Sequence, residues 1–363
     1  MTALRLRDSG AHEPSPIAAD RPRRPYPNGW FALAFGEQVP AGGVLRTRFM
    51  GEDLVVYRTR AGIVRVVEPY CPHLGAHLGY GGTIEGEEII CPFHRFAFDV
   101  DGACVRSGYG TRPPAARLRQ RTVRERNGAI MVWRHAAGAP PEWELPDLPT
   151  GEFPAPVRHA YTIVDHPQEI VENAVDVGHI GPIHHYTNVR VRQPLALDGP
   201  RLRIGPAGER VFPLLGDVDV IFDVEAHGLG YIWVRATIPR LQAAALFQAM
   251  ATPIDPCRVT LRFSVAVRTG IAQRAPSGRS LLLSRALTVG LAPAFWRDLR
   301  RDFPIWENKA YVERPRLAKG DGPIGAFRRW ADQFYAGCDD AAARSASLDR
   351  DGTKRPATPS STV

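Results

Sequence analysis

Two short groups of cysteine and histidine constrain this chain of 363 residues more than any other feature. Cys71 and His73 are separated by a proline, Cys91 and His94 by a proline and a phenylalanine, and residues 74–90 lie between the two groups. Each group offers one thiolate and one imidazole. Together they match a [2Fe–2S] site in which two cysteines hold one iron and two histidines hold the other. Such a site exchanges single electrons, and its neutral imidazoles raise the reduction potential.

A structural zinc site is the main alternative, since zinc is also held by two cysteines and two histidines. Zinc fingers usually group cysteine with cysteine and histidine with histidine, whereas both groups here are mixed. The mixed groups favour the iron–sulfur interpretation, which is known as a Rieske site. Cysteine and histidine placed by chance in unrelated loops are the remaining alternative. The predicted cluster ligands are Cys71, His73, Cys91 and His94.

The composition is that of an ordinary globular protein, with 44% hydrophobic and 23% charged residues in a chain long enough for two domains. The net charge of +8 comes almost wholly from arginine, without long basic runs or interleaved aromatic residues. We therefore expect no nucleic-acid binding. A basic surface suits an acidic electron-transfer partner, and an arginine-rich surface without any partner is the alternative.

The cysteine count and the apolar stretches indicate the cellular compartment of the protein. Beyond the two assigned cysteines, Cys104, Cys257 and Cys338 are scattered, which is no disulfide framework and fits a reducing compartment. Residues 1–24 lack the apolar core of a signal peptide. The longest apolar stretches, near 241–254 and 281–295, are interrupted and too short to span a bilayer. We expect a cytoplasmic protein without a transmembrane segment.

Turn residues and apolar patterns divide the chain into four segments. Residues 1–24 and 339–363 have the polar, proline- and serine-containing composition of disordered tails. Residues 25–145 show short strands separated by turns, which predicts a small antiparallel β domain with the cluster loops at two hairpin tips. A stiff proline-containing linker follows, and residues 146–338 form the second domain. The strands expected in the first domain are 44–49, 54–59, 63–67 and 129–133.

The second domain is predicted to be α+β, an antiparallel sheet with helices at its side. A helix is expected over 167–180, with Pro167 in its first turn and a Gly-Pro pair at 181–182 as its end. Further helices are expected near 291–303 and 323–336. The expected strands are 217–225, 230–237 and 259–269.

The helix predicted over 167–180 carries a possible second metal site. Glu172, Asp176 and His179 fall on one face, and His184 follows after the Gly-Pro break. Two histidines with a carboxylate from elsewhere form the facial triad of a non-heme Fe(II) site, which leaves coordination positions open. An acidic helix face beside a loop histidine is usually only solvated. Downstream of a one-electron cluster, however, a terminal metal site is favoured.

At residues 25–336 the chain resembles the α subunits of Rieske non-heme iron oxygenases, closest in pattern to the 3-ketosteroid 9α-hydroxylase and sterol desaturase branch. The resemblance rests on the two cluster groups and on a second motif, Glu172-Asn173-x-x-Asp176-x-x-His179-x-x-x-x-His184. It implies an all-β Rieske [2Fe–2S] domain followed by a helix-grip, START-like sheet whose helices hold the mononuclear iron.

The resemblance also implies roles for individual residues. His179 and His184 would bind the mononuclear iron, and Asp302 would be the third ligand. Asp298, four residues before Asp302, is the alternative carboxylate, and His185 is the rival second imidazole.

The motif places Asn173 and Asp176 beside the iron as candidate catalytic residues. Asp176 would accept hydrogen bonds from His179 and from His94 of a neighbouring subunit. This bridge implies a head-to-tail homotrimer, in which electrons cross between subunits.

The implied function is that of a terminal monooxygenase that uses O₂ on a small apolar substrate. Electrons from NAD(P)H would arrive through a separate ferredoxin or flavin reductase, because the chain has no dinucleotide-binding glycine motif after a strand. The implied reaction is hydroxylation or desaturation of a bulky apolar ring substrate, steroid-like or a polycyclic natural product. An arylamine, alkaloid or pyrrole-type substrate is the alternative.

Two functions of other classes compete with the oxygenase. A Rieske-type electron carrier would need only the first domain and would leave about two hundred residues unexplained. A zinc-stabilised nucleic-acid-binding module would use the positive charge, but no basic or aromatic array supports it.

Overall fold

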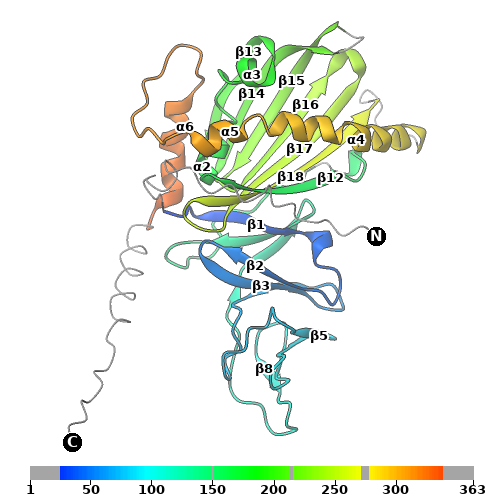
Figure 1. Ribbon diagram of the computed structural model, residues 1–363, viewed down its shortest axis with the longest axis vertical. Coiled ribbons are helices and arrows are strands. Elements are labelled where there is room, and N and C mark those ends of the chain that lie inside the picture. Colours follow the sequence, from blue (N-terminus) through cyan, green and yellow to red (C-terminus); the bar gives the residue numbers. More distant parts are fainter. Residues whose placement is uncertain (1–24, 149, 213–215, 271–277, 338–363) are drawn as a thin grey trace, which may run out of the picture.

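The computed structural model describes residues 25–148, 150–212, 216–270 and 278–337, so the predicted tails lie outside the described residues. Figure 1 shows a large sheet crossed by a long helix at one end and a group of small sheets at the other. The predicted α+β architecture, a β domain followed by an antiparallel sheet with helices, is confirmed.

Three small antiparallel sheets make up the N-terminal part, with the strand orders β1-β11-β10, β2-β3-β4-β9 and β5-β6-β7-β8. The third sheet carries the two loops with the predicted cluster ligands and lies farthest from the large sheet in Figure 1. The strands are β1 Gly29–Phe35, β2 Val44–Phe49, β3 Glu52–Arg58, β4 Val64–Val67, β5 Thr83–Glu85, β6 Glu88–Ile90, β7 Ala97–Phe98, β8 Cys104–Arg106, β9 Gln120–Arg121, β10 Val123–Arg126 and β11 Ala129–Arg134.

A seven-stranded antiparallel sheet dominates the C-terminal part, in the order β12-β18-β17-β16-β15-β14-β13. Its strands are β12 Val157–Val164, β13 Thr187–Asp198, β14 Arg201–Phe212, β15 Gly216–His227, β16 Tyr231–Ile238, β17 Ala243–Pro253 and β18 Arg258–Thr269. The helices are α2 Pro167–Glu172, α3 Ile180–His184, α4 Gly278–Leu299, α5 Phe303–Asn308 and α6 Ile324–Ala331, with 3₁₀ turns η1 Gly36–Gln38, η2 Thr150–Glu152, η3 Pro239–Leu241 and η4 Asp332–Tyr335.

Strand β1 explains how the two parts pack, because all seven of its residues are buried. One set of its side chains, including Phe31 and Leu33, belongs to the core of the N-terminal sheets. The other set, including Trp30 and Ala32, packs against Tyr231 and Met250 of the large sheet. A strand that is covered on both faces needs apolar residues at successive positions, not in alternation.

A buried arginine ties the large sheet to β1. The side chain of Arg262 in β18 donates to the carbonyl of Ala32 at 2.7 Å and to that of Leu33. Leu33 lies at a register shift in the pairing of β1 with β11, and its carbonyl accepts a hydrogen bond from Arg262. Burial lowers the pKa of Arg262 to about 10. The guanidinium thus satisfies backbone oxygens that the irregular strand presents to the interface.

Replacing Arg262 with leucine is expected to destabilise the protein. The Leu33 carbonyl would lose its buried partner, which costs about 1–3 kcal/mol of unfolding free energy. Arg258→Leu, in an exposed pair with Asp255 at the start of the same strand, is the matched control and should cost less than about 1 kcal/mol. Urea denaturation of both variants measures the difference, and equal midpoints would contradict this role for Arg262.

The prediction of one continuous helix over 167–180 is wrong, because two short helices, α2 and α3, occupy this region. Helix α2 begins at Pro167, where His166 caps the end by accepting the N–H of Gln168 at 3.2 Å. It ends at Glu172, turns follow, and α3 begins at Ile180. The predicted Gly-Pro stop at 181–182 lies inside α3, where the proline occupies an early position and lacks only an N–H that a first turn leaves unbonded.

The helix predicted near 291–303 is longer at its start and shorter at its end, because α4 covers 278–299. Strand β18 runs past the end of its pairing with β12, which stops at Val265. Side chains of α4 complete that free edge: Thr288 accepts the N–H of Val267 at 2.8 Å, and Ser284 accepts the N–H of Thr269 at 3.1 Å. The partner that anchors the first half of α4 is therefore a strand edge, which a sequence pattern does not reveal.

Candidate metal centres

The two cluster loops have the same backbone geometry. In each loop the N–H of the cysteine donates at 2.8 Å to the carbonyl five residues later. The N–H four residues after the cysteine donates back to the cysteine carbonyl, from Gly75 to Cys71 at 2.9 Å and from Arg95 to Cys91 at 3.1 Å. Gly75 and Arg95 both have left-handed backbone angles, with φ of 75° and 55°. The repeated turn presents each cysteine and histidine in an equivalent way.

The four predicted ligands gather at the tips of these loops. Cys71 and Cys91 are buried, and the rings of His73 and His94 lie side by side with their centroids 4.9 Å apart. Phe96 is stacked on His73 at 4.4 Å, which fixes the ring orientation. Two inner thiols and two outer imidazoles are the complete donor set of a Rieske cluster, so these residues fit the group.

Burial, together with the neighbouring Cys91 thiol, raises the pKa of Cys71 to about 11. A cysteine binds metal as the thiolate. In the protein without metal, Cys71 would keep its proton at neutral pH. Binding of iron at this site therefore has to displace that proton.

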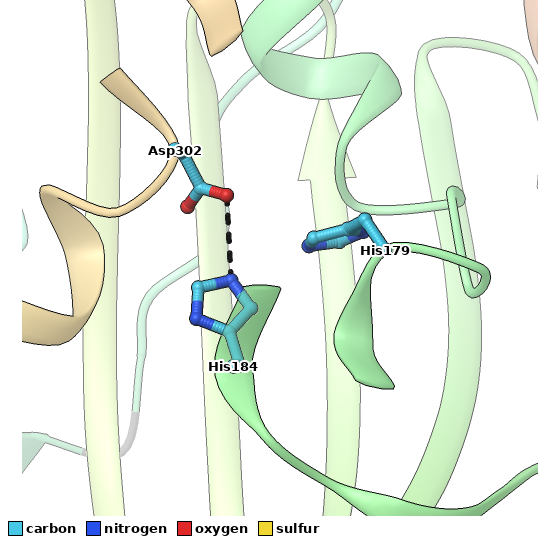
Figure 2. A group of neighbouring side chains, drawn as sticks. All are labelled: His179, His184 and Asp302. Atoms are coloured by element: carbon cyan, nitrogen blue, oxygen red, sulfur yellow. Dashed lines mark ion pairs between the residues drawn. The ribbon is translucent and has the colours of Figure 1, made fainter. Parts of the chain in front are cut away.

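A second set of donors lies in the C-terminal part, where His179, His184 and Asp302 point toward one another (Figure 2). One potential ligand atom from each residue lies within 4.8 Å of the others. The Nε2 atom of His184 is 3.4 Å from a carboxylate oxygen of Asp302. Asp302 is buried, and each histidine side chain is only 15% exposed. Two imidazoles and one carboxylate could hold a divalent metal and leave other positions open.

Three helix ends position these side chains. His179 immediately precedes α3, His184 is its last residue, and Asp302 immediately precedes α5. The side chain of Arg301 donates to the carbonyl of Ile183 at 3.1 Å and so holds the two helix ends together. Short helices that end at the site bring residues from distant parts of the sequence into one cluster.

The rival residue His185 lies outside this group of three. It ends α3 in a left-handed conformation with φ of 58°, and its side chain is exposed. The backbone reversal at this position turns adjacent histidines in different directions, so only His184 faces Asp302.

The surroundings of His179 select which ring nitrogen is free for a metal. Its Nδ1 atom is hydrogen-bonded to the main-chain carbonyl of Asp176, so Nδ1 carries the proton. The Nε2 atom then presents its lone pair, and the amide nitrogen of Asn173 lies 3.1 Å from it. The carboxylate of Asp176 accepts the main-chain N–H of His179 at 3.3 Å and is 37% exposed. One face of Asp176 therefore remains open to the surface.

His184 lies between two carboxylates. Its Nδ1 atom is 3.5 Å from Asp298, which in turn receives two hydrogen bonds of 3.0 Å from Arg210. Burial alone would lower the pKa of His184, but Asp298 and Asp302 raise it to about 9. Burial would raise the pKa of Asp298, but His184 and Arg210 lower it to about 2. No sequence motif pointed to Arg210, which comes from strand β14.

Glu172 of the acidic helix face and two further histidines have structural contacts. Glu172 forms a forked ion pair with Arg328 of α6, at 2.7 and 2.9 Å, and so faces away from the site. His227 is bonded to Glu225 at 2.7 Å, and His77 accepts the N–H of Gly79 at 3.0 Å.

A cavity of about 100 Å³ lies elsewhere, between residues 153–156 and strands β17 and β18. Gln248 and Ser264 line it, whereas Phe247 and Phe263, one position earlier in each strand, contact aromatic rings of α4 on the opposite face. Successive residues of a strand point to opposite faces. The cavity therefore lies on the face of the sheet opposite α4.

Comparison with known proteins assigns both parts of the chain to one family. A model of the Rieske [2Fe–2S] domain matches residues 29–117, and a model of the 3-ketosteroid 9α-hydroxylase C-terminal domain matches residues 132–335. Cholesterol 7-desaturase of Ciona intestinalis is 31% identical over 345 residues, covering 85% of this chain and 69% of its own. The probable oxygenase component of 3-ketosteroid-9-alpha-monooxygenase from Rhodococcus rhodochrous is 27% identical, covering 89% and 84%.

Solved structures share the fold. Dicamba monooxygenase bound to dicamba superimposes with a TM-score of 0.67 at 20% identity, covering 88% of this chain and all of its own. The QL mutant of NdmA from Pseudomonas putida with theobromine gives a TM-score of 0.62 at 18% identity, covering 84% of this chain and 89% of its own. Among the described residues, no helix combines the length and the apolar character needed to cross a membrane.

Proposed function

Because the chain belongs to the Rieske oxygenases of the 3-ketosteroid 9α-hydroxylase and cholesterol 7-desaturase family, we propose that it is the terminal oxygenase of a multicomponent system. The observation that carries this proposal is the presence of two different metal donor sets in one chain. A Rieske electron carrier accounts for the first set and leaves the buried group of His179, His184 and Asp302 without a purpose.

Each donor set has its own task in the proposed enzyme. When bound, the cluster supplies electrons singly and the mononuclear iron supplies open positions for dioxygen beside the substrate. Cys71 and Cys91 hold the cluster from inside, while His73 and His94 hold it from the surface. His179, His184 and Asp302 hold the iron, with Asn173 beside His179.

The proposed substrate is a bulky apolar ring compound of the sterol or steroid class, which is hydroxylated or desaturated. Support comes from the relatives named for cholesterol and 3-ketosteroids. Support also comes from half-buried aromatic rings on the sheet, since Phe247 lies 5.1 Å from Phe295 of α4 and Phe222 lies 5.6 Å from Tyr186, which follows α3. Aromatic side chains of this kind form apolar contacts with fused rings.

We further propose a head-to-tail homotrimer in which electrons pass from His94 of one subunit to Asp176 of the next. The sheet that carries the cluster loops and helix α3 lie at opposite ends of the molecule in Figure 1. A direct path for electrons between the two donor sets of one subunit is therefore long. The cluster end also carries large side chains that are all more than half exposed, as expected of a surface that is covered on assembly. They are Tyr70, Leu74, Tyr80, Phe93 and Tyr109.

The proposed electron source is NAD(P)H, through a separate ferredoxin or flavin reductase that docks by charge complementarity on the arginine-rich surface. The proposed location is the cytoplasm. No disulfide joins the four cysteines among the described residues, which fits a reducing compartment.

Metal analysis of protein purified without oxygen tests the proposal. We expect three irons and two acid-labile sulfides per chain, and oxygen uptake that depends on a sterol or 3-ketosteroid when a promiscuous reductase is added. Two irons with two sulfides would indicate an electron carrier instead, and a colourless zinc protein would contradict both iron sites.

A further inference from the structure

We propose that Asp298 is a positioning residue for the mononuclear iron, which acts by holding His184 and is itself held by Arg210. The inference rests on the proposed function, because it concerns the iron site, and it assigns a task to a carboxylate that the sequence left as an alternative ligand. Three observations carry it.

The first observation is that the two ring nitrogens of His184 face two different carboxylates. Nε2 lies 3.4 Å from Asp302, which shares the ligand group with His179. Nδ1 is shielded from solvent and makes no hydrogen bond among the described residues, and Oδ2 of Asp298 lies 3.5 Å from it, at ion-pair distance. An imidazole that binds a metal through one nitrogen carries its proton on the other. The geometry therefore leaves Nε2 for the metal and directs the Nδ1 proton toward Asp298.

The second observation is that Asp298 is held in place from the sheet. Arg210 of β14 reaches across to α4 and donates to both oxygens of Asp298, each at 3.0 Å. The guanidinium in turn lies 5.2 Å from the centre of the Tyr186 ring. A planar fork that binds both carboxylate oxygens fixes position and orientation together. Asp298 is thereby kept on the Nδ1 side of His184.

The third observation is the contrast between the two carboxylates. Both oxygens of Asp298 are bonded to Arg210, whereas Asp302 is buried without a salt bridge to any arginine or lysine among the described residues. A carboxylate that is neutralised by arginine is a poor metal ligand, and one that faces only imidazoles is a good one. The two aspartates, one helical turn apart in sequence, thus have separate tasks.

A partner of this kind on a metal-bound histidine fixes the ring orientation and raises the basicity of the ligand, and its loss typically costs 10–100-fold in metal affinity. We therefore expect graded effects from two variants. Asp298→Asn keeps an acceptor oxygen and loses the charge, so Fe(II) affinity should fall about 10-fold. Asp298→Ala loses both, and affinity should fall about 100-fold.

The experiment titrates Fe(II) into the mononuclear site against a competing chelator, with the cluster already in place. The electron paramagnetic resonance signal of the nitric oxide adduct is the second readout, because it reports on the orientation of the iron ligands. Asp219→Asn is the matched control, since Asp219 is paired with Arg190 on the exposed part of the sheet. We expect a shifted signal in both Asp298 variants, an unchanged signal in the control, and an unaltered cluster spectrum throughout.

Fe(II) affinities within twofold of the parent, with an unshifted signal in both Asp298 variants, would overturn the inference. So would complete loss of iron in Asp298→Ala together with normal iron in Asp302→Ala, because Asp298 would then be a ligand. A parent protein with a cluster but no mononuclear iron would instead refute the proposed oxygenase, and the inference with it. If Asp298→Ala does not fold, the Fe(II) affinities of Asp298→Asn and Arg210→Met test the inference instead. A higher Fe(II) affinity in Arg210→Lys than in Arg210→Met would support it.

Discussion

Replacing Asp302 with alanine is expected to remove the mononuclear iron and abolish turnover while the visible spectrum of the cluster stays intact. The change leaves two neutral imidazoles, which are too few donors to retain Fe(II). The fold should survive, because Asp302 precedes α5 without making a side-chain capping bond to it. Iron should fall from about three to about two per chain, as measured by metal analysis alongside sulfide, which should stay at about two.

The comparison with Asp298→Ala makes this prediction specific. That variant should keep iron when Fe(II) is supplied in excess, because only the positioning of His184 is lost. Normal turnover by Asp302→Ala would show that the third ligand has been misassigned, whatever the effect at Asp298.

Replacing Asp176 with asparagine is expected to leave both metals bound and to stop electron flow between them. The asparagine oxygen can still accept the main-chain N–H of His179, and the ring of that histidine is held by the carbonyl of residue 176, which the change does not touch. The lost charge removes the acceptor proposed for His94 of the neighbouring subunit. In a single turnover of reduced protein, cluster reoxidation should slow by on the order of 100-fold.

The control for this variant is again Asp219→Asn, which removes one exposed aspartate charge that is paired with Arg190 and belongs to neither donor set. Reoxidation at the parent rate in Asp176→Asn would refute the bridging role. It would leave the oxygenase assignment intact, since that depends on the metals and not on the path between them.

Sequence patterns predicted the structure well where the feature depends on residue type and on short spacing along the chain. The prediction of strand 44–49 is confirmed to the residue, and the two cluster loops place their four ligands together. The repeated hydrogen-bond pattern of these loops was missed, because its left-handed position is glycine in one loop and arginine in the other. The two loops thus share the backbone geometry of this position without sharing its residue type.

The predicted helix bounds are wrong where a segment distant in the sequence decides the local structure. The helix predicted over 167–180 stops at Glu172, and the chain around Val175 is closely covered by Gly322, where a Cβ would lie 2.2 Å from the Val175 carbonyl oxygen. That contact joins residues almost 150 positions apart and outweighs helix propensity, which is worth less than about 1 kcal/mol per residue.

The amino-acid sequence by itself predicted the proposed cluster ligands, the two histidines of the proposed second site and the division into a β domain and an α+β domain. These depend on donor atoms at short intervals and on the periodicity of apolar residues, both of which are local. The resemblance favoured Asp302 over Asp298, but only the tertiary structure shows how their surroundings differ. Asp298 lies in α4, Asp302 lies between α4 and α5, and among the described residues the sheet brings an arginine only to Asp298. Arg210 arrives from β14, binds one carboxylate, and leaves the other facing the imidazoles.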